Sequence, residues 1–248
     1  MSTETSFQLK PLWKKLFPQS WIFIAGLAIL LAIPRFVVLL NGNYNAIIII
    51  FMFMWATPFW LLSSQGRKQI GLTKPSRPAW LLWGFVLGIA SAVILYLIGY
   101  FIYGNSADHW YTSVMNTFNR GTIIQDIRPN YLFFLLFALP TMIFSPIGEE
   151  FFFRGIMQEA FAEQWGTRTA TVVEATFFGV THLAHHGLIA TTVGYRLLPS
   201  AFPWIFLMMA VSILLSIVRN QSGSIWGAVL CHAGFNLGMM WSIFYLMN

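Results

Sequence analysis

The sequence predicts an all-α integral membrane protein in which about eight transmembrane helices enclose a polar cavity. Hydrophobic residues make up 57% of the 248 residues and charged residues only 9%, against about 25% charged in an ordinary soluble domain. Apolar runs long enough to cross a bilayer core follow one another almost without pause. They are continuously apolar rather than alternating, which disfavours a β-barrel. Helices are the remaining way to satisfy the backbone in lipid.

The predicted helices follow one another along most of the chain. They span 21–40, 46–62, 80–103, 131–147, 148–164, 168–184, 203–218 and 224–247. The first lacks a convincing signal-peptide cleavage site and is therefore expected to remain as an anchor. No room is left for a separate soluble domain. We divide the chain into a cytoplasmic tail at 1–20, N-terminal transmembrane helices at 21–130 and a core at 131–248.

Basic residues predict the orientation of these helices. Cytoplasmic loops are enriched in Lys and Arg, and the richest stretches here are the N-terminal tail and the loop after the second predicted helix. Both are expected in the cytoplasm, and eight crossings would return the C-terminus to the same side. The net charge of +6 comes from scattered Lys and Arg, which argues against a nucleic-acid partner. The lone Cys231 excludes an internal disulfide.

Ionisable residues concentrate in the hydrophobic C-terminal part of the chain. Five of the eight acidic residues and four of the five histidines lie in the last 100 residues. They are Glu149, Glu150, Glu159, Glu163, Glu174, His182, His185, His186 and His232. Ionisable groups within a membrane are costly, about 2.5–3.5 kcal/mol for Asp, Lys or Arg at a helix centre, so such a cluster predicts a functional site.

The first candidate element is Glu149, Glu150 and Arg154. Glu150 and Arg154 are four residues apart and share a helix face, where they can form an ion pair. Glu149 points about 100° away and is expected to lack a partner on its own helix, which makes it a candidate general base. The alternative is that all three side chains lie solvated at a membrane boundary.

The second element is a stripe of Glu174, Phe178 and His182, each four residues after the last. The stripe brings a carboxylate and an imidazole to one helix face, two turns apart. A hydrogen-bonded interior histidine is the plainer interpretation of His182. His185 and His186 follow where the helix meets the 187–200 loop, and we expect them to be interfacial rather than catalytic.

The third element is His232 and Asn236, which share one face of the last predicted helix with the small residue Ala228. Polar side chains at mid-membrane need partners, and hydrogen bonds between packed helices would supply them. The functional alternative is that both are donors to a negative charge that develops in a reaction.

In this order on separate hydrophobic helices, the three elements resemble the CPBP family of intramembrane proteases. The motifs are Glu149-Glu150-x-x-x-Arg154, Phe178-x-x-x-His182 and His232-x-x-x-Asn236. The family includes CAAX prenyl endopeptidases and the bacterial bacteriocin-processing and immunity proteins also called Abi. The resemblance implies an intramembrane endopeptidase whose catalytic core is 131–248.

The resemblance also implies roles for single residues. Glu149 and His182 would activate the water that attacks a peptide carbonyl, and His232 with Asn236 would stabilise the oxyanion. Glu150, Arg154 and Phe178 would support the site.

Cofactor and partners are less constrained by the sequence. Glu149, His182 and His232 could hold zinc with one open position, but there is no His-Glu-x-x-His helix, and we favour water activation without a metal. The expected substrate is a membrane-associated peptide or protein, such as a bacteriocin precursor, at a bacterial cell membrane. Two alternatives remain: a non-catalytic immunity or scaffold protein that binds a toxin receptor or sensor kinase, and a proton-coupled transporter.

Overall fold

The computed structural model describes residues 6–41, 44–120, 131–191 and 194–247. Residues 1–5 of the predicted tail and 121–130, before the fourth predicted helix, lie outside the described residues. The helices are α1 (Pro11–Leu16), α2 (Ser20–Leu40), α3 (Tyr44–Leu61), α4 (Ser64–Gln69), α5 (Ala79–Tyr103), α6 (Trp110–Arg120), α7 (Tyr131–Glu149), η1 (Glu150–Met157), α8 (Gln158–Thr181), η2 (His182–Ala184), α9 (Ala201–Ser222) and α10 (Ile225–Tyr245). Strands β1 (Leu188–Thr191) and β2 (Gly194–Leu197) form one antiparallel hairpin.

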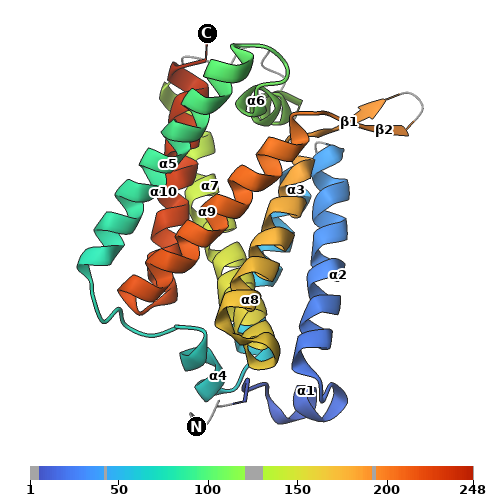
Figure 1. Ribbon diagram of the computed structural model, residues 1–248, viewed down its shortest axis with the longest axis vertical. Coiled ribbons are helices and arrows are strands. Elements are labelled where there is room, and N and C mark those ends of the chain that lie inside the picture. The colour runs from blue at the N-terminus through green and yellow to red at the C-terminus, as the bar shows by residue number, and fades with distance from the viewer. Residues whose placement is uncertain (1–5, 42–43, 121–130, 192–193, 248) are drawn as a thin grey trace.

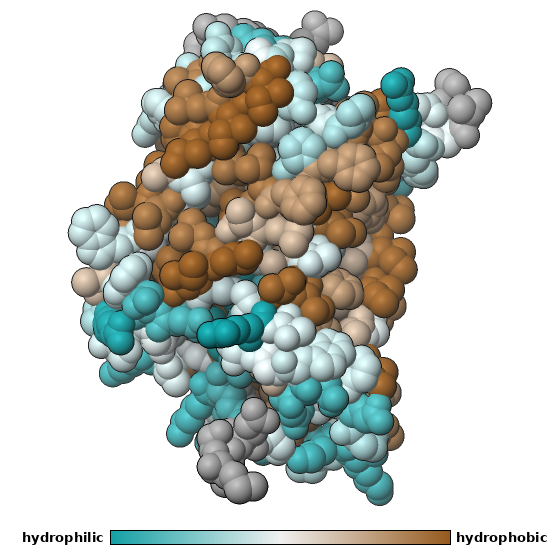
Figure 2. Space-filling model, viewed as in Figure 1, coloured by the Kyte–Doolittle hydropathy of each residue, from teal (hydrophilic) through white to brown (hydrophobic). Residues whose placement is uncertain are grey.

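The all-α membrane class is confirmed. Within the described residues, five helical runs are long and apolar enough to cross a membrane, and a shorter apolar helix spans Ala46–Leu61. The long helices pack side by side along the long axis of the molecule (Figure 1). Large apolar side chains cover the outside, where Phe101, Leu132 and Ile49 are 91%, 71% and 68% exposed. Figure 2 shows this apolar surface above a hydrophilic lower end, as expected for a surface that faces lipid.

The predicted helices 131–147 and 148–164 are one continuous helix, so the predicted count of eight is not confirmed. Helix α7 runs directly into η1, a stretch of π-helix, and then into α8. The chain turns back at Gly166, whose φ of 77° and ψ of 160° are not helical. Phe153 and Phe178, from either side of this turn, have ring centroids 5.7 Å apart. Helix α8 therefore folds back along η1.

The described ends of the chain lie at opposite ends of the molecule. Figure 1 shows α1 at the lower end and the end of α10 at the upper end. This placement does not support the expectation that both termini are cytoplasmic. With two predicted helices merged into one, the predicted crossings no longer return the C-terminal end to the side of α1, so the side of the membrane on which each terminus lies stays a prediction.

Close packing between α5 and α10 positions the last predicted motif. A Cβ atom on Gly88 of α5 would collide with the carbonyl oxygen of Cys231, and one on Gly234 of α10 would collide with the carbonyl oxygen of Phe85. Only glycine permits this approach of two backbones, a common device in membrane helix packing. The contact holds α10 in place on both sides of His232.

A larger residue in this contact is expected to destabilise the protein. Gly88→Val should lower the free energy of unfolding by about 1–3 kcal/mol, because α5 and α10 must separate to admit the side chain. Gly26→Val is the matched control, since a Cβ atom on Gly26 meets nothing within 4 Å. Thermal unfolding in detergent measures both, and equal midpoints would contradict the packing argument.

Candidate functional site

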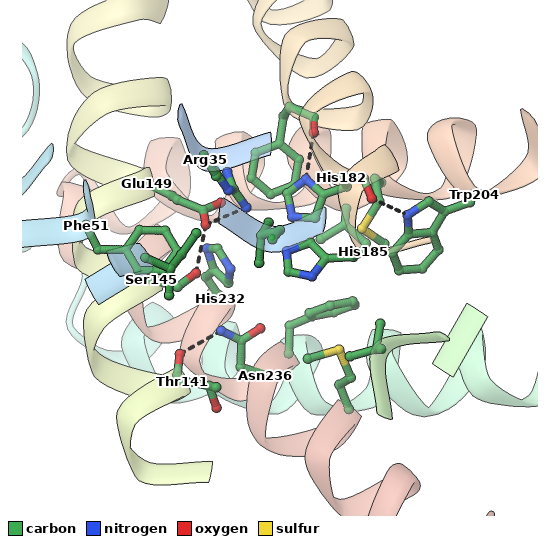
Figure 3. Close-up of a pocket in the computed structure, with 18 residues that line it drawn as sticks. Arg35, Phe51, Thr141, Ser145, Glu149, His182, His185, Trp204, His232 and Asn236 are labelled. Atoms are coloured by element: carbon green, nitrogen blue, oxygen red, sulfur yellow. Dashed lines mark hydrogen bonds and ion pairs between the residues drawn. The ribbon is translucent and has the colours of Figure 1, made fainter. Parts of the chain in front are cut away.

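A cavity of about 120 Å³ lies inside the helix bundle (Figure 3). The four predicted catalytic residues, Glu149, His182, His232 and Asn236, all line it. Most of its other walls are apolar side chains from α2, α3, α6, α8, α9 and α10. Its volume admits a few water molecules, at about 30 Å³ each in the liquid. The structure therefore confirms a cavity with polar groups among the helices.

Glu149 ends α7 and is 1% exposed. Its Oε1 accepts a hydrogen bond of 2.8 Å from Ser145 Oγ and lies 3.0 Å from Arg35 Nη2. The expectation that Glu149 lacks a partner on its own helix is wrong, because the Ser145 hydroxyl lies one turn before it. The other oxygen, Oε2, is buried and has no hydrogen-bond partner among the described residues. One carboxylate oxygen is thus held and the other remains an acceptor.

Arg35 is a charged site residue that the sequence analysis missed. It comes from α2, is 3% exposed and lines the same cavity. Its guanidinium carbon lies 5.6 Å from the centre of the Phe51 ring. The signal in the sequence was a single charge within the first apolar segment. A buried charge needs a counter-charge, but the sequence could not say which carboxylate supplies it.

His182 begins η2, directly after α8. Its Nδ1 lies 2.6 Å from the carbonyl oxygen of Phe178. Because a carbonyl only accepts, Nδ1 carries the hydrogen and Nε2 of the neutral ring is an acceptor. The Phe178 ring packs at 4.2 Å between centroids, and Trp204 Nε1 donates to the His182 carbonyl at 2.9 Å. These contacts fix the position and the tautomer of the imidazole.

Glu150 and Arg154 form the predicted ion pair, buried behind the cavity. Arg154 Nε lies 3.1 Å from Glu150 Oε2, and its Nη1 lies 3.6 Å from Glu174 Oε1. The guanidinium also stacks 4.1 Å above the Phe178 ring, and Ser212 Oγ donates to Glu174 at 2.9 Å. Glu150, Arg154 and Glu174 are all 0% exposed. The alternative of side chains solvated at a membrane boundary is therefore wrong for this group.

His232 and Asn236 each contact another helical segment. His232 Nδ1 lies 2.6 Å from Glu150 Oε1, and Asn236 Nδ2 donates to the carbonyl oxygen of Thr141 at 2.7 Å. The predicted interhelical hydrogen bonds are thus present. These two contacts do not use the second N–H of Asn236 or the Nε2 atom of His232, so the donor interpretation stays a prediction. Paired with Glu150, a protonated His232 would offer an Nε2–H donor.

The two remaining histidines of the region have different surroundings. His185 lines the cavity, with its ring centroid 5.5 Å from that of His182. His186 is buried outside it, with Nδ1 2.7 Å from Ser113 Oγ and Nε2 2.9 Å from Ser200 Oγ. Burial lowers the pKa of His186 to about 4, so the ring is neutral at neutral pH. One ring nitrogen then donates and the other accepts, which ties the chain after η2 to α6.

The arrangement does not fit the zinc site considered from the sequence. Among the described residues, no three His, Cys, Asp or Glu side chains are grouped to hold a metal ion. Glu149 Oε1 is shared by Ser145 and the cationic Arg35, and His232 Nδ1 is taken by Glu150.

Comparison with known proteins adds one finding. Residues 131–238 match the model of a family described as type II CAAX prenyl endopeptidase, Rce1-like. The matched range contains Glu149, Glu150, Arg154, Phe178, His182, His232 and Asn236 and excludes Arg35. No curated protein and no solved structure matches the chain.

Proposed function

Because residues 131–238 belong to the Rce1-like type II CAAX prenyl endopeptidase family, we propose that the protein is an intramembrane endopeptidase that hydrolyses a peptide bond of a membrane-associated substrate. One observation carries the proposal. A carboxylate oxygen and an imidazole nitrogen, each an acceptor, line one buried cavity of about 120 Å³. A water molecule has two hydrogens, so it can donate one hydrogen bond to the carboxylate of Glu149 and the other to the imidazole of His182.

In the first step, Glu149 acts as general base and His182 helps to hold the water. The water oxygen forms a bond to the carbonyl carbon of the substrate, and the π electrons of the carbonyl move to its oxygen. The water proton passes to Oε2 of Glu149. The Ser145 hydroxyl and Arg35 hold Oε1 meanwhile, which keeps the carboxylate in place.

In the second step, the tetrahedral intermediate collapses. The carbonyl forms again as the C–N bond breaks, and the proton held by Glu149 passes to the leaving nitrogen. The products are a carboxylic acid and an amine, and Glu149 returns to its ionised form. His232 and Asn236 donate to the oxygen that bears the negative charge between the two steps. Glu150, Arg154 and Phe178 support the site by holding His232 and His182.

The surroundings of the cavity support an apolar, membrane-associated substrate. An apolar groove of about 230 Å³ lies between α3 and α7. It shares four lining residues with the cavity: Ile47, Phe51, Thr141 and Ser145. A lipid chain or an apolar helix that lies in this groove would bring a neighbouring peptide bond to Glu149. Within this class, our candidate substrate is a bacterial bacteriocin precursor or signalling peptide. The protein would cleave it as a multi-pass protein of the cell membrane.

The test is cleavage of prenylated and unmodified reporter peptides by the purified protein in lipid vesicles. His182→Gln should lower cleavage by roughly 10²–10⁴-fold, the usual contribution of a positioned acid or base. His186→Gln is the matched control, because His186 is buried between two serines outside the cavity. It should fold and cleave like the unaltered protein. Exhaustive chelation should also leave cleavage in place.

Three outcomes would contradict the proposal. Full cleavage by His182→Gln would remove the histidine from the mechanism. If chelation removed one zinc per chain and abolished cleavage, the water would be activated by a metal and not by the metal-free mechanism proposed here. An absence of cleavage, with immunity to a toxin that survives the same substitution, would favour a non-catalytic immunity protein.

A further inference from the structure

The guanidinium of Arg35 has donors that the proposed chemistry has not used. Nη2 lies 3.0 Å from Glu149 Oε1, whereas Nε and Nη1 are buried and have no hydrogen-bond partner among the described residues. A buried donor without a partner carries the full cost of its desolvation, and more so when it is charged. Arg35 lines the cavity, so a group that enters the cavity could satisfy these donors.

Resting on the proposed function, we propose that Arg35 is a catalytic residue whose guanidinium donates a hydrogen bond, from Nε or Nη1, to the oxyanion of the tetrahedral intermediate. Figure 3 draws its guanidinium beside Glu149, between that residue and His182 in the view. Arg35 comes from α2, outside the matched range 131–238. The family model therefore does not assign it.

The charges of the site support this role. In the resting cavity, the guanidinium balances the ionised carboxylate of Glu149. When water attacks, the proton moves to Glu149 and the negative charge moves to the oxygen of the substrate. The sum of the charges is unchanged, so the same guanidinium balances both states. A fixed counter-charge in a buried site is worth far more than in water and needs no reorganisation at the moment of reaction.

The other side chains proposed to stabilise the oxyanion have fewer hydrogen-bond donors available. Asn236 already gives one N–H to Thr141, and His232 gives its Nδ1 side to Glu150. Asn236 therefore has one donor left for the oxyanion, and His232 has one only when its ring is protonated. Arg35 offers an unpartnered N–H on Nε or Nη1 together with a full positive charge.

A carboxylate of the substrate is a less suitable partner for Arg35. Such a group would place a second negative charge beside the ionised Glu149, with one guanidinium between them in a buried cavity. Like charges at this distance repel strongly where water is scarce. The oxyanion differs because it forms only as Glu149 becomes neutral.

The experiment compares Arg35→Gln and Arg35→Lys with the unaltered protein in lipid vesicles. It measures kcat and KM for a reporter peptide and the affinities of two inhibitors. One is a peptide phosphonate, whose anionic oxygen stands for the oxyanion and which should bind with a proton on Glu149, as in the intermediate. The other is the methylene-amine peptide, which lacks that oxygen. Arg35→Gln should lower kcat by roughly 10²–10³-fold, as for loss of an oxyanion donor, with KM little changed. Phosphonate affinity should fall with it, and methylene-amine affinity should not.

The Arg35→Lys variant tests whether a loss of activity results only from a failure to fold. It keeps the positive charge beside Glu149 but lacks the planar fork, so its unfolding midpoint should stay close to that of the unaltered protein while kcat falls by at least about 10-fold. Added guanidinium ion should restore part of the activity of Arg35→Ala.

Several outcomes would overturn the inference. Equal weakening of both inhibitors would mean that Arg35 only shapes the cavity. A rise in KM confined to peptides with a free C-terminal or side-chain carboxylate, compared with their amides, would make Arg35 a carboxylate-binding residue. Unchanged kcat in Arg35→Lys and Arg35→Gln would exclude a catalytic role and leave the proposed function intact. Absence of cleavage by the unaltered protein would overturn the proposed function and this inference together.

Discussion

Replacing Glu149 by glutamine is expected to lower peptide cleavage by roughly 10²–10⁴-fold, because the amide cannot take the proton of the attacking water. Glutamine keeps the size of the side chain and can still accept a hydrogen bond from Ser145, so the cavity should keep its shape. The protein should insert and fold, although Arg35 loses its counter-charge. Cleavage of a reporter peptide in vesicles and the unfolding midpoint are the two measurements.

Glu159→Gln is the matched control for this change. Glu159 also pairs with an arginine, Arg219 at 2.6 Å, but it is 32% exposed and does not line the cavity. Partly exposed ion pairs contribute only about 0–1 kcal/mol. The control should therefore cleave like the unaltered protein. Equal cleavage by the Glu149→Gln and Glu159→Gln variants would rule out Glu149 as the base.

Arg154→Met should have the largest effect on stability, a loss of about 3–5 kcal/mol in the free energy of unfolding. The substitution removes the cation that lies between Glu150 and Glu174, both 0% exposed. It also removes the stacking on Phe178. Two buried carboxylates would then face each other without the guanidinium. Denaturant unfolding in detergent measures the loss.

A second substitution separates charge from packing in this cluster. Adding Glu174→Gln to Arg154→Met should recover part of the lost stability, because only Glu150 then remains charged and His232 still contacts it. Arg168→Met is the control for the loss of an arginine, since Arg168 is exposed; it should change stability by no more than about 0.5 kcal/mol. If the double variant were no more stable than Arg154→Met, repulsion between the carboxylates would not be the cause.

Much of the fold could be predicted because hydropathy is a local property. Five predicted helices, 21–40, 46–62, 80–103, 203–218 and 224–247, agree closely with α2, α3, α5, α9 and α10. The boundary at 147–148 was wrong for a physical reason. Adjacent carboxylates suggest the end of an apolar helix, but here both are buried, with Arg35 beside Glu149 and Arg154 beside Glu150. Helix α7 can therefore continue into η1 within the protein.

In the candidate site, too, some contacts could be predicted from the sequence and others could not. Contacts within one helix, such as Glu150 with Arg154 and Phe178 with His182, follow from the 3.6-residue period and were predicted. Contacts between segments far apart were not. These include Glu149 with Arg35 and His232 with Glu150.

The amino-acid sequence by itself determined the membrane class, the helical character of the chain and the concentration of acids and histidines in its C-terminal part, because each depends on residue type and near neighbours. Only the tertiary structure decided that 131–147 and 148–164 form one helix and that Arg35 faces Glu149. A buried charge takes its partner from whichever helix packs against it, and the spacing along a single helix does not reveal that choice.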